Sequence, residues 1–255
     1  MLQFHFSEPM QPNIHTSFIM SPITEILTDV VSASVGIGSG IETFPMCDYV
    51  MQSVFLKMTG FQEQKLKCIC WELASVDFEY RYDYKTNPVG ERSSYNDKQT
   101  LYKDLIGQLQ KRSKNFKVAS DLDKKEILNR TTTAVKEIFA ESNLSIWSQK
   151  SFNEYGIIWN EIKTKHFAND NNNLFTALKD GELSLQVIYR DYLYRFRNRI
   201  AHNTQSYQQN LPTLNTLVSQ NYIYENYFIW FSTLVLIDEI FRELYRLYLQ
   251  TFVDQ

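Results

Sequence analysis

The chain has 255 residues and a net charge of −3, with 44% hydrophobic and 22% charged residues. A chain of this length and composition can bury a substantial core, which excludes wholesale disorder. Eight glycines and six prolines are few for this length, which disfavours a β-sandwich or barrel and favours long helices. The total charge does not indicate a nucleic-acid-binding protein, so a role of that kind depends on local basic residues.

The N-terminus, the apolar stretches and the cysteines predict a protein of the cytoplasm. Residues 1–20 lack the basic start and apolar run of a signal peptide. The most apolar stretch, Tyr227 to Ile237, is shorter than the roughly 20 residues that a membrane helix needs. Cys47, Cys68 and Cys70 suit neither a disulfide framework nor a zinc ribbon, so we expect reduced thiols in the core.

Hydrophobic periodicity and capping residues predict helices in chain order, with no strand of convincing length. Residues 1–20 are polar and aperiodic, which indicates a tail or a short strand. Helices are expected at about 21–34, 45–60, 61–82, 98–112, 121–142, 152–167, 184–202 and 222–252. Gly36, Gly38 and Gly40 form a connector, because no Lys-Ser/Thr pair follows them to make a phosphate loop. The pattern predicts an all-α helical bundle.

A basic run with one aromatic residue, Lys111 to Lys117, follows the helix predicted at 98–112. The simpler interpretation is a solvated helix end and loop. The alternative is a patch that contacts phosphates, in which Lys114 would help to bind a nucleic-acid substrate.

The run from Tyr194 to Asn203 holds the residue types that metal-independent RNA cleavage requires. Such cleavage uses the neighbouring 2′-hydroxyl as nucleophile. A proton must move near neutral pH, which suits His202 as general acid or base. Charge develops on the phosphorane, which suits the donor fork of Arg197. Asn198 adds an uncharged polar group that orients either His202 or the phosphate.

Helix geometry limits how these residues can cooperate. Positions five apart on a continuous helix lie about 140° apart around the axis, so Arg197 and His202 would not point the same way. Asn198 and His202, four apart, would share a face. Either the helix ends or bends before His202, or the site is assembled from more than one copy of the motif, and the chain holds only one copy.

The run Arg197-Asn198-x3-His202 resembles the signature of the HEPN superfamily, in which Arg and a polar residue precede His. The resemblance covers mainly the region from about Asp121 to the C-terminus. It implies a small helical bundle with the motif near a helix end, in which two protomers form one composite ribonuclease site. It also implies a metal-independent endoribonuclease without a cofactor, acting as a toxin or antiviral-defence effector, homodimeric and controlled by an antitoxin or other regulatory partner.

The resemblance divides the chain into residues 121–255, a HEPN-like helical domain, and residues 1–120. The N-terminal part holds additional helices, either separate or in the same bundle. The expected catalytic residues are Arg197, His202 and Asn198, with no metal ligands. The expected RNA-binding residues are Arg195, Arg199, Tyr194 and Lys114.

Two alternatives assign the motif no catalysis. In one, His202 interacts with the negative end of the helix dipole, and the arginines pair with acids of a neighbouring helix. Those arginines are Arg190, Arg195, Arg197 and Arg199. In the other, a HEPN-like helical dimer binds RNA, a nucleotide or a protein partner without cutting. The aromatic C-terminal helix is expected to be core rather than dimer interface.

Overall fold

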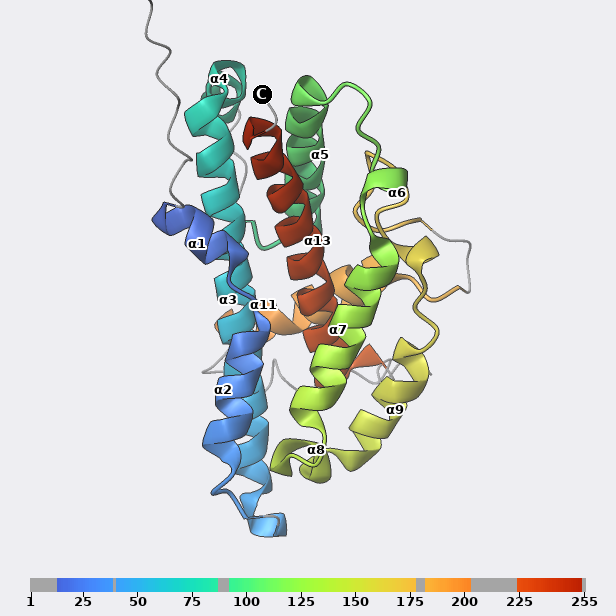
Figure 1. The fold of residues 1–255 in the computed structure, drawn as a ribbon. Coiled ribbons are helices and arrows are strands. Elements are labelled where there is room, and N and C mark those ends of the chain that lie inside the picture. Colours follow the sequence, from blue (N-terminus) through green and yellow to red (C-terminus); the bar gives the residue numbers. More distant parts are fainter. Residues whose placement is uncertain (1–12, 39, 87–91, 178–181, 203–223, 254–255) are drawn as a thin grey trace, which may run out of the picture.

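The computed structural model describes residues 13–38, 40–86, 92–177, 182–202 and 224–253 (Figure 1). Helices contain 79% of these residues. An isolated bridge between Phe167 and Phe175 is the only β-pairing in the described part of the chain. The predicted all-α class is therefore confirmed.

The helical elements follow one another along the chain with short connections. They are α1 (Ile14–Met20), α2 (Thr24–Ser34), η1 (Ile41–Thr43), α3 (Phe44–Val76), α4 (Phe78–Thr86), α5 (Tyr95–Arg112), α6 (Val118–Asp121), α7 (Lys124–Phe139), α8 (Asn143–Trp147), α9 (Gln149–Trp159), η2 (Thr164–His166), α10 (Leu185–Val187), η3 (Ile188–Leu193), α11 (Tyr194–His202) and α13 (Tyr227–Val253). Two of these, η1 and η2, are short 3-10 helices, whereas η3 is π-helical.

Helix α13 forms the centre of the bundle and packs against α3, α5, α7 and α9 (Figure 1). Every residue from Phe228 to Phe241 is buried, as expected for a helix surrounded by other helices. The aromatic C-terminal helix is thus core, as predicted, and its apolar face is not available for a dimer interface. Helices from both sides of residue 120 contribute to the same apolar cluster.

A buried ion pair fastens the α1–α2 connection to this core. The Lys65 ammonium lies 2.6 Å from the Asp238 carboxylate, and each side chain is 3% exposed. Lys65 also donates to the Ser21 carbonyl, and Asp238 accepts from the Ile23 amide at 3.1 Å. These hydrogen bonds satisfy charges that would be costly to bury alone.

Two predictions about the N-terminal half are wrong. Ile14–Met20 forms helix α1 rather than a tail or strand, because Asn13 caps it and Ile19 is buried against the core. Gly60 does not separate two helices, since α3 continues through it from Phe44 to Val76. Packing of α3 against α1, α2 and α13 outweighs the weak helix preference of one glycine.

Helix ends with local capping signals are closer to prediction. Ser94 and Asp97 form a capping box that starts α5 at Tyr95, and Asp123 caps α7. The helix expected at 152–167 is wrong at both ends, because α9 begins at Gln149 and ends at Trp159. The polar connector expected after His202 lies outside the described residues.

The cysteines lie where the sequence predicts. Cys47 and Cys70 are buried, Cys68 packs against the core, and all three are free thiols. None of the described helices is both long enough and apolar enough to cross a bilayer.

Candidate functional site

The Arg-Asn-x3-His motif lies on a helical run that Ser184 caps and that the structure describes as far as His202. The Ser184 hydroxyl accepts from the Val187 amide at 3.4 Å, and α10, η3 and α11 then follow without interruption. The π-helical segment Ile188–Leu193 directly precedes the motif. Such segments are rare, are frequent at functional sites, and change the direction in which the following side chains point. In Figure 1, α11 lies behind α3 near the middle of the bundle.

Phe196 anchors α11 to the bundle. Its ring centroid lies 4.5 Å from that of Trp230, 5.6 Å from that of Tyr227 and 5.9 Å from that of Phe55. Aromatic pairs at such separations contribute about 0.5–1.5 kcal/mol beyond their buried area. The backbone at the neighbouring residue, Arg197, is therefore held against α3 and α13.

The Arg197 guanidinium is held by two side chains. Nη2 donates to Glu63 Oε1 of α3 at 3.0 Å, and Nη1 donates to Asn198 Oδ1 at 3.1 Å. The Arg197 side chain is 21% exposed and that of Glu63 is 12% exposed. Nε is buried, with no hydrogen-bond partner among the described residues. The expected pairing of an arginine with an acid of a neighbouring helix thus occurs at Arg197.

Helix α11 continues as a regular α-helix to His202. The positions of Arg197 and His202 are therefore about 140° apart around its axis, whereas those of Asn198 and His202 share a face. The His202 side chain is outside the described part of the structure. The helix neither ends nor bends before His202. This excludes one of the two ways in which Arg197 and His202 could act at the same site.

Lys98 of α5 is buried near the Arg197–Glu63 pair and was not among the predicted site residues. It is 1% exposed, donates to the Arg92 carbonyl at 2.7 Å and lies over the Tyr189 ring at 5.3 Å. Burial lowers the pKa of its ammonium to about 7, and the charge of Glu63 is the largest opposing effect. A buried lysine with a pKa near neutrality is a feature of functional sites, although structural networks also produce it.

The sequence contained a signal for Lys98 but none for Glu63. Lys98 shares a helical face with Leu101, Tyr102 and Leu105, which are all core residues. A lysine at a core-facing position indicates a special environment. Glu63 has no comparable local signal, because its partner comes from a distant segment of the chain.

Lys98 should make the protein more stable as the pH rises. Its pKa is about 7 in the folded state and near 10.5 when unfolded, so between these values the unfolded chain binds more protons. From about pH 7 to about pH 8.5, the free energy of unfolding of the wild type should rise relative to that of Lys98→Met by an amount on the order of 1 kcal/mol. Urea unfolding of both proteins at the two pH values measures this gain, and a constant difference between them would contradict it.

The predicted RNA-binding residues do not all gather at the motif. Tyr194 packs partly against the core, Arg195 is exposed and Arg199 is half-buried. Neither arginine forms an ion pair with another described residue. Lys114 is exposed in the turn after α5.

The basic run that contains Lys114 contacts the far end of α3. Lys111 pairs with Asp77 at 2.6 Å, and Arg112 lies 3.7 Å from the centroid of the Phe252 ring. Asp77 follows Glu63 by 14 residues, which is about 21 Å along a helix axis. Within one chain, the structure therefore does not bring Lys114 to the motif. Lys111 and Arg112 fit the simpler interpretation of the basic run, a solvated helix end.

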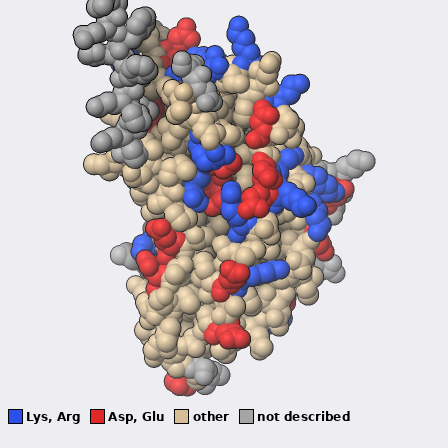
Figure 2. All heavy atoms as spheres, in the orientation of Figure 1, with Lys and Arg blue, Asp and Glu red and all other residues tan. Residues whose placement is uncertain are grey.

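The face of the molecule seen in Figure 2 carries intermingled acidic and basic residues. Helices α7 and α13 are joined by an ion-pair network. Arg130 and Arg242 both bind Glu239, at 3.0 and 2.5 Å, and Arg246 binds Glu243 at 2.5 Å. Because acidic and basic side chains alternate, the described residues of this face form no continuous basic path for a nucleic acid.

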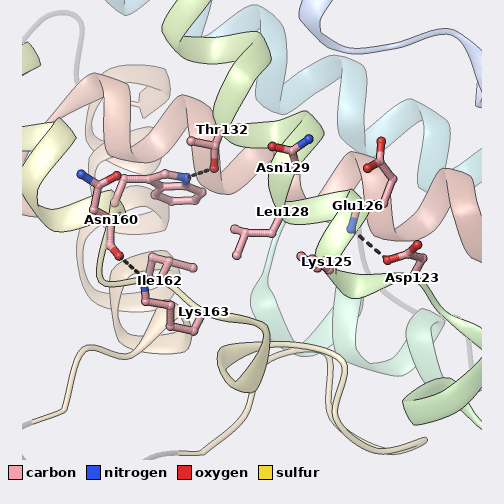
Figure 3. A pocket seen from close by; sticks show the side chains of 10 residues that line it. Asp123, Lys125, Glu126, Leu128, Asn129, Thr132, Asn160, Ile162 and Lys163 are labelled. Carbon is pink, nitrogen blue, oxygen red and sulfur yellow. Dashed lines mark hydrogen bonds between the residues drawn. The ribbon is translucent and has the colours of Figure 1, made fainter.

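A cavity of about 530 Å³ lies between α7 and residues 159–163 (Figure 3). Trp159 lines this cavity, and its indole donates to the Thr132 hydroxyl at 3.0 Å. Asp123 also lines this cavity and is already engaged in capping α7. None of the predicted site residues lines this cavity, so it is separate from the motif.

Comparisons with models of protein families, with curated proteins and with solved structures find no match to this chain. Within the described ranges, no three His, Cys, Asp or Glu side chains are grouped so that they could hold a metal ion. Any functional assignment therefore depends on the geometry of the chain itself.

Proposed function

We propose that the protein is a HEPN-type, metal-independent endoribonuclease that cuts RNA at a site shared by two copies of the chain. The observation that supports this proposal is that the whole motif lies on one regular helix. Arg197 is partly exposed, and the position of His202 lies about 140° from it around the helix axis. Because these two positions face different sides of the helix, we assign the two groups at one phosphodiester to different copies of the chain. A second copy can supply the missing partner.

In this proposal, Arg197 binds the scissile phosphate and stabilises the charge of the phosphorane. Each Nη of a guanidinium carries two N–H groups. Since Nη1 serves Asn198 and Nη2 serves Glu63, one N–H of each is left for a phosphate oxygen.

His202 of the other copy moves the proton as general acid or base. The 2′-oxygen forms a bond to phosphorus while the bond to the 5′-oxygen breaks, which yields a 2′,3′-cyclic phosphate and a 5′-hydroxyl. Asn198 orients the guanidinium through its amide oxygen. An unrestrained ribonuclease would harm its host, so a cytoplasmic toxin or antiviral-defence effector under the control of an antitoxin or another partner is part of the proposal.

The Glu63 ion pair favours a second candidate function. A guanidinium paired with a half-buried carboxylate is also what a purely structural contact between α11 and α3 would use. In that case the protein is a HEPN-like helical dimer that binds RNA, a nucleotide or a protein partner without cutting it.

Purified protein is expected to cleave fluorescent RNA in the presence of EDTA, because no step uses a metal ion. It should leave the matching 2′-deoxy oligonucleotide intact, because that substrate lacks the nucleophile. Gel electrophoresis measures cleavage, and mass spectrometry identifies the cyclic phosphate. Cleavage that EDTA stops, or cleavage of the deoxy substrate, removes this mechanism. Binding by fluorescence anisotropy without any product favours the second candidate.

A further inference from the structure

We propose that Glu63 is a positioning residue for Arg197 during RNA cleavage, an inference that rests on the proposed ribonuclease function. Glu63 is 134 residues from Arg197 in the chain and reaches it from α3. It touches neither the substrate nor the reacting atoms in this proposal. It acts through the direction that it imposes on the guanidinium.

The contacts of Arg197 define that direction. The Glu63 carboxylate accepts from Nη2 and the Asn198 amide oxygen accepts from Nη1, so rotation of the guanidinium plane would break both hydrogen bonds. Nε is buried, which leaves the Nη ends as the part that can reach a phosphate. Both members of the ion pair are mostly shielded from water, which makes the pair more restrictive than one between exposed side chains.

The surroundings of Glu63 also favour a fixed carboxylate. It belongs to the long helix α3, and Phe196, beside Arg197, packs against Phe55 of the same helix. The backbones that carry Glu63 and Arg197 are therefore held together independently of the ion pair. A side chain placed by rigid elements in this way can orient a catalytic group more closely than one on a loop.

The test measures cleavage by full-length Glu63→Gln, which keeps the shape of the side chain and removes its charge. The rate constant kcat should fall by about 100-fold, while KM stays within about threefold, because misplacement by about 1 Å has an effect of that size on chemistry. Glu72→Gln is the matched control. Glu72 lies on the same helix, is 14% exposed and binds His15 at 2.9 Å, so its loss should change stability but not kcat.

A second comparison separates positioning from a structural role. In an Arg197→Ala background, Glu63→Gln should have no further effect on the residual rate, because its action passes through Arg197. Glu63→Asp keeps the charge on a shorter chain and should recover part of kcat. If Glu63→Gln fails to fold, Glu63→Asp tests the positioning role instead. Its kcat and KM are measured in the wild-type chain and in the Arg197→Ala background.

The outcomes distinguish this inference from the proposed function. If Glu63→Gln changes only the melting temperature, as Glu72→Gln does, or lowers the residual rate of Arg197→Ala, the positioning role is overturned and the ribonuclease assignment stands. If Arg197→Ala cleaves RNA as fast as the wild type, the proposed site is wrong and the role of Glu63 is overturned with it.

Discussion

Replacement of His202 by alanine is expected to lower the rate of RNA cleavage by about 10²–10⁴-fold, the effect of losing one positioned acid–base group. The reason is that the 2′-hydroxyl must lose a proton and the 5′-oxygen must gain one near neutral pH, and imidazole is the side chain suited to both. Binding of a non-cleavable 2′-deoxy oligonucleotide should change little. Single-turnover cleavage and fluorescence anisotropy measure the two quantities separately.

His15→Ala is the control for this prediction. His15 lies on α1 and pairs with Glu72, away from α11, so its replacement should leave cleavage unchanged. Expression in a bacterial host gives a second readout, since overexpression should be toxic and the toxicity should disappear in His202→Ala and Arg197→Ala. Undiminished cleavage by pure His202→Ala protein would exclude this residue as the acid–base group.

Co-expression of Arg197→Ala and His202→Ala chains is expected to restore the cleavage that each variant alone has largely lost. A mixed dimer holds one Arg197 on one chain and one His202 on the other. If each active site takes Arg197 from one copy and His202 from the other, the mixed dimer contains one complete site. The rate should rise by about 10²-fold or more over that of either variant, because both groups of the reaction are again present.

The mixed dimers are isolated with two different affinity tags and verified by native mass spectrometry. A pair of Arg197→Ala chains that differ only in their tags serves as the control and should keep the low residual rate of that variant. Verified mixed dimers without activity would mean that the two groups do not meet across a subunit boundary. A monomer at all concentrations in light scattering would contradict the composite site directly.

The ion pair between Glu63 and Arg197 is compatible with both candidate functions. A structural ion pair and a positioned catalytic arginine have the same static geometry, with one Nη–O distance of 3.0 Å. They differ in what happens to kcat when the carboxylate loses its charge. The EDTA assay, the His202 variant and the mixed dimer each test a separate part of the same assignment.

The helical class could be predicted from the sequence because its signals are local. Ser94, Asp123 and Ser184 cap helices through amide groups only three residues further along the chain. The scarcity of glycine and proline and the regular spacing of apolar residues act over similarly short distances. For the same reason, the sequence alone placed the motif on a helix and predicted that the positions of Arg197 and His202 diverge around its axis.

Only the tertiary structure decided which distant side chains meet. The pairing of Arg197 with Glu63, the burial of Lys98 beside them and the separation of Lys114 from the motif depend on how α3, α5 and α11 pack together. The same packing keeps α3 continuous through Gly60 and folds Ile14–Met20 into α1. Local periodicity specifies which face of a helix is apolar, but the neighbour that covers it is selected by the free energy of the whole core.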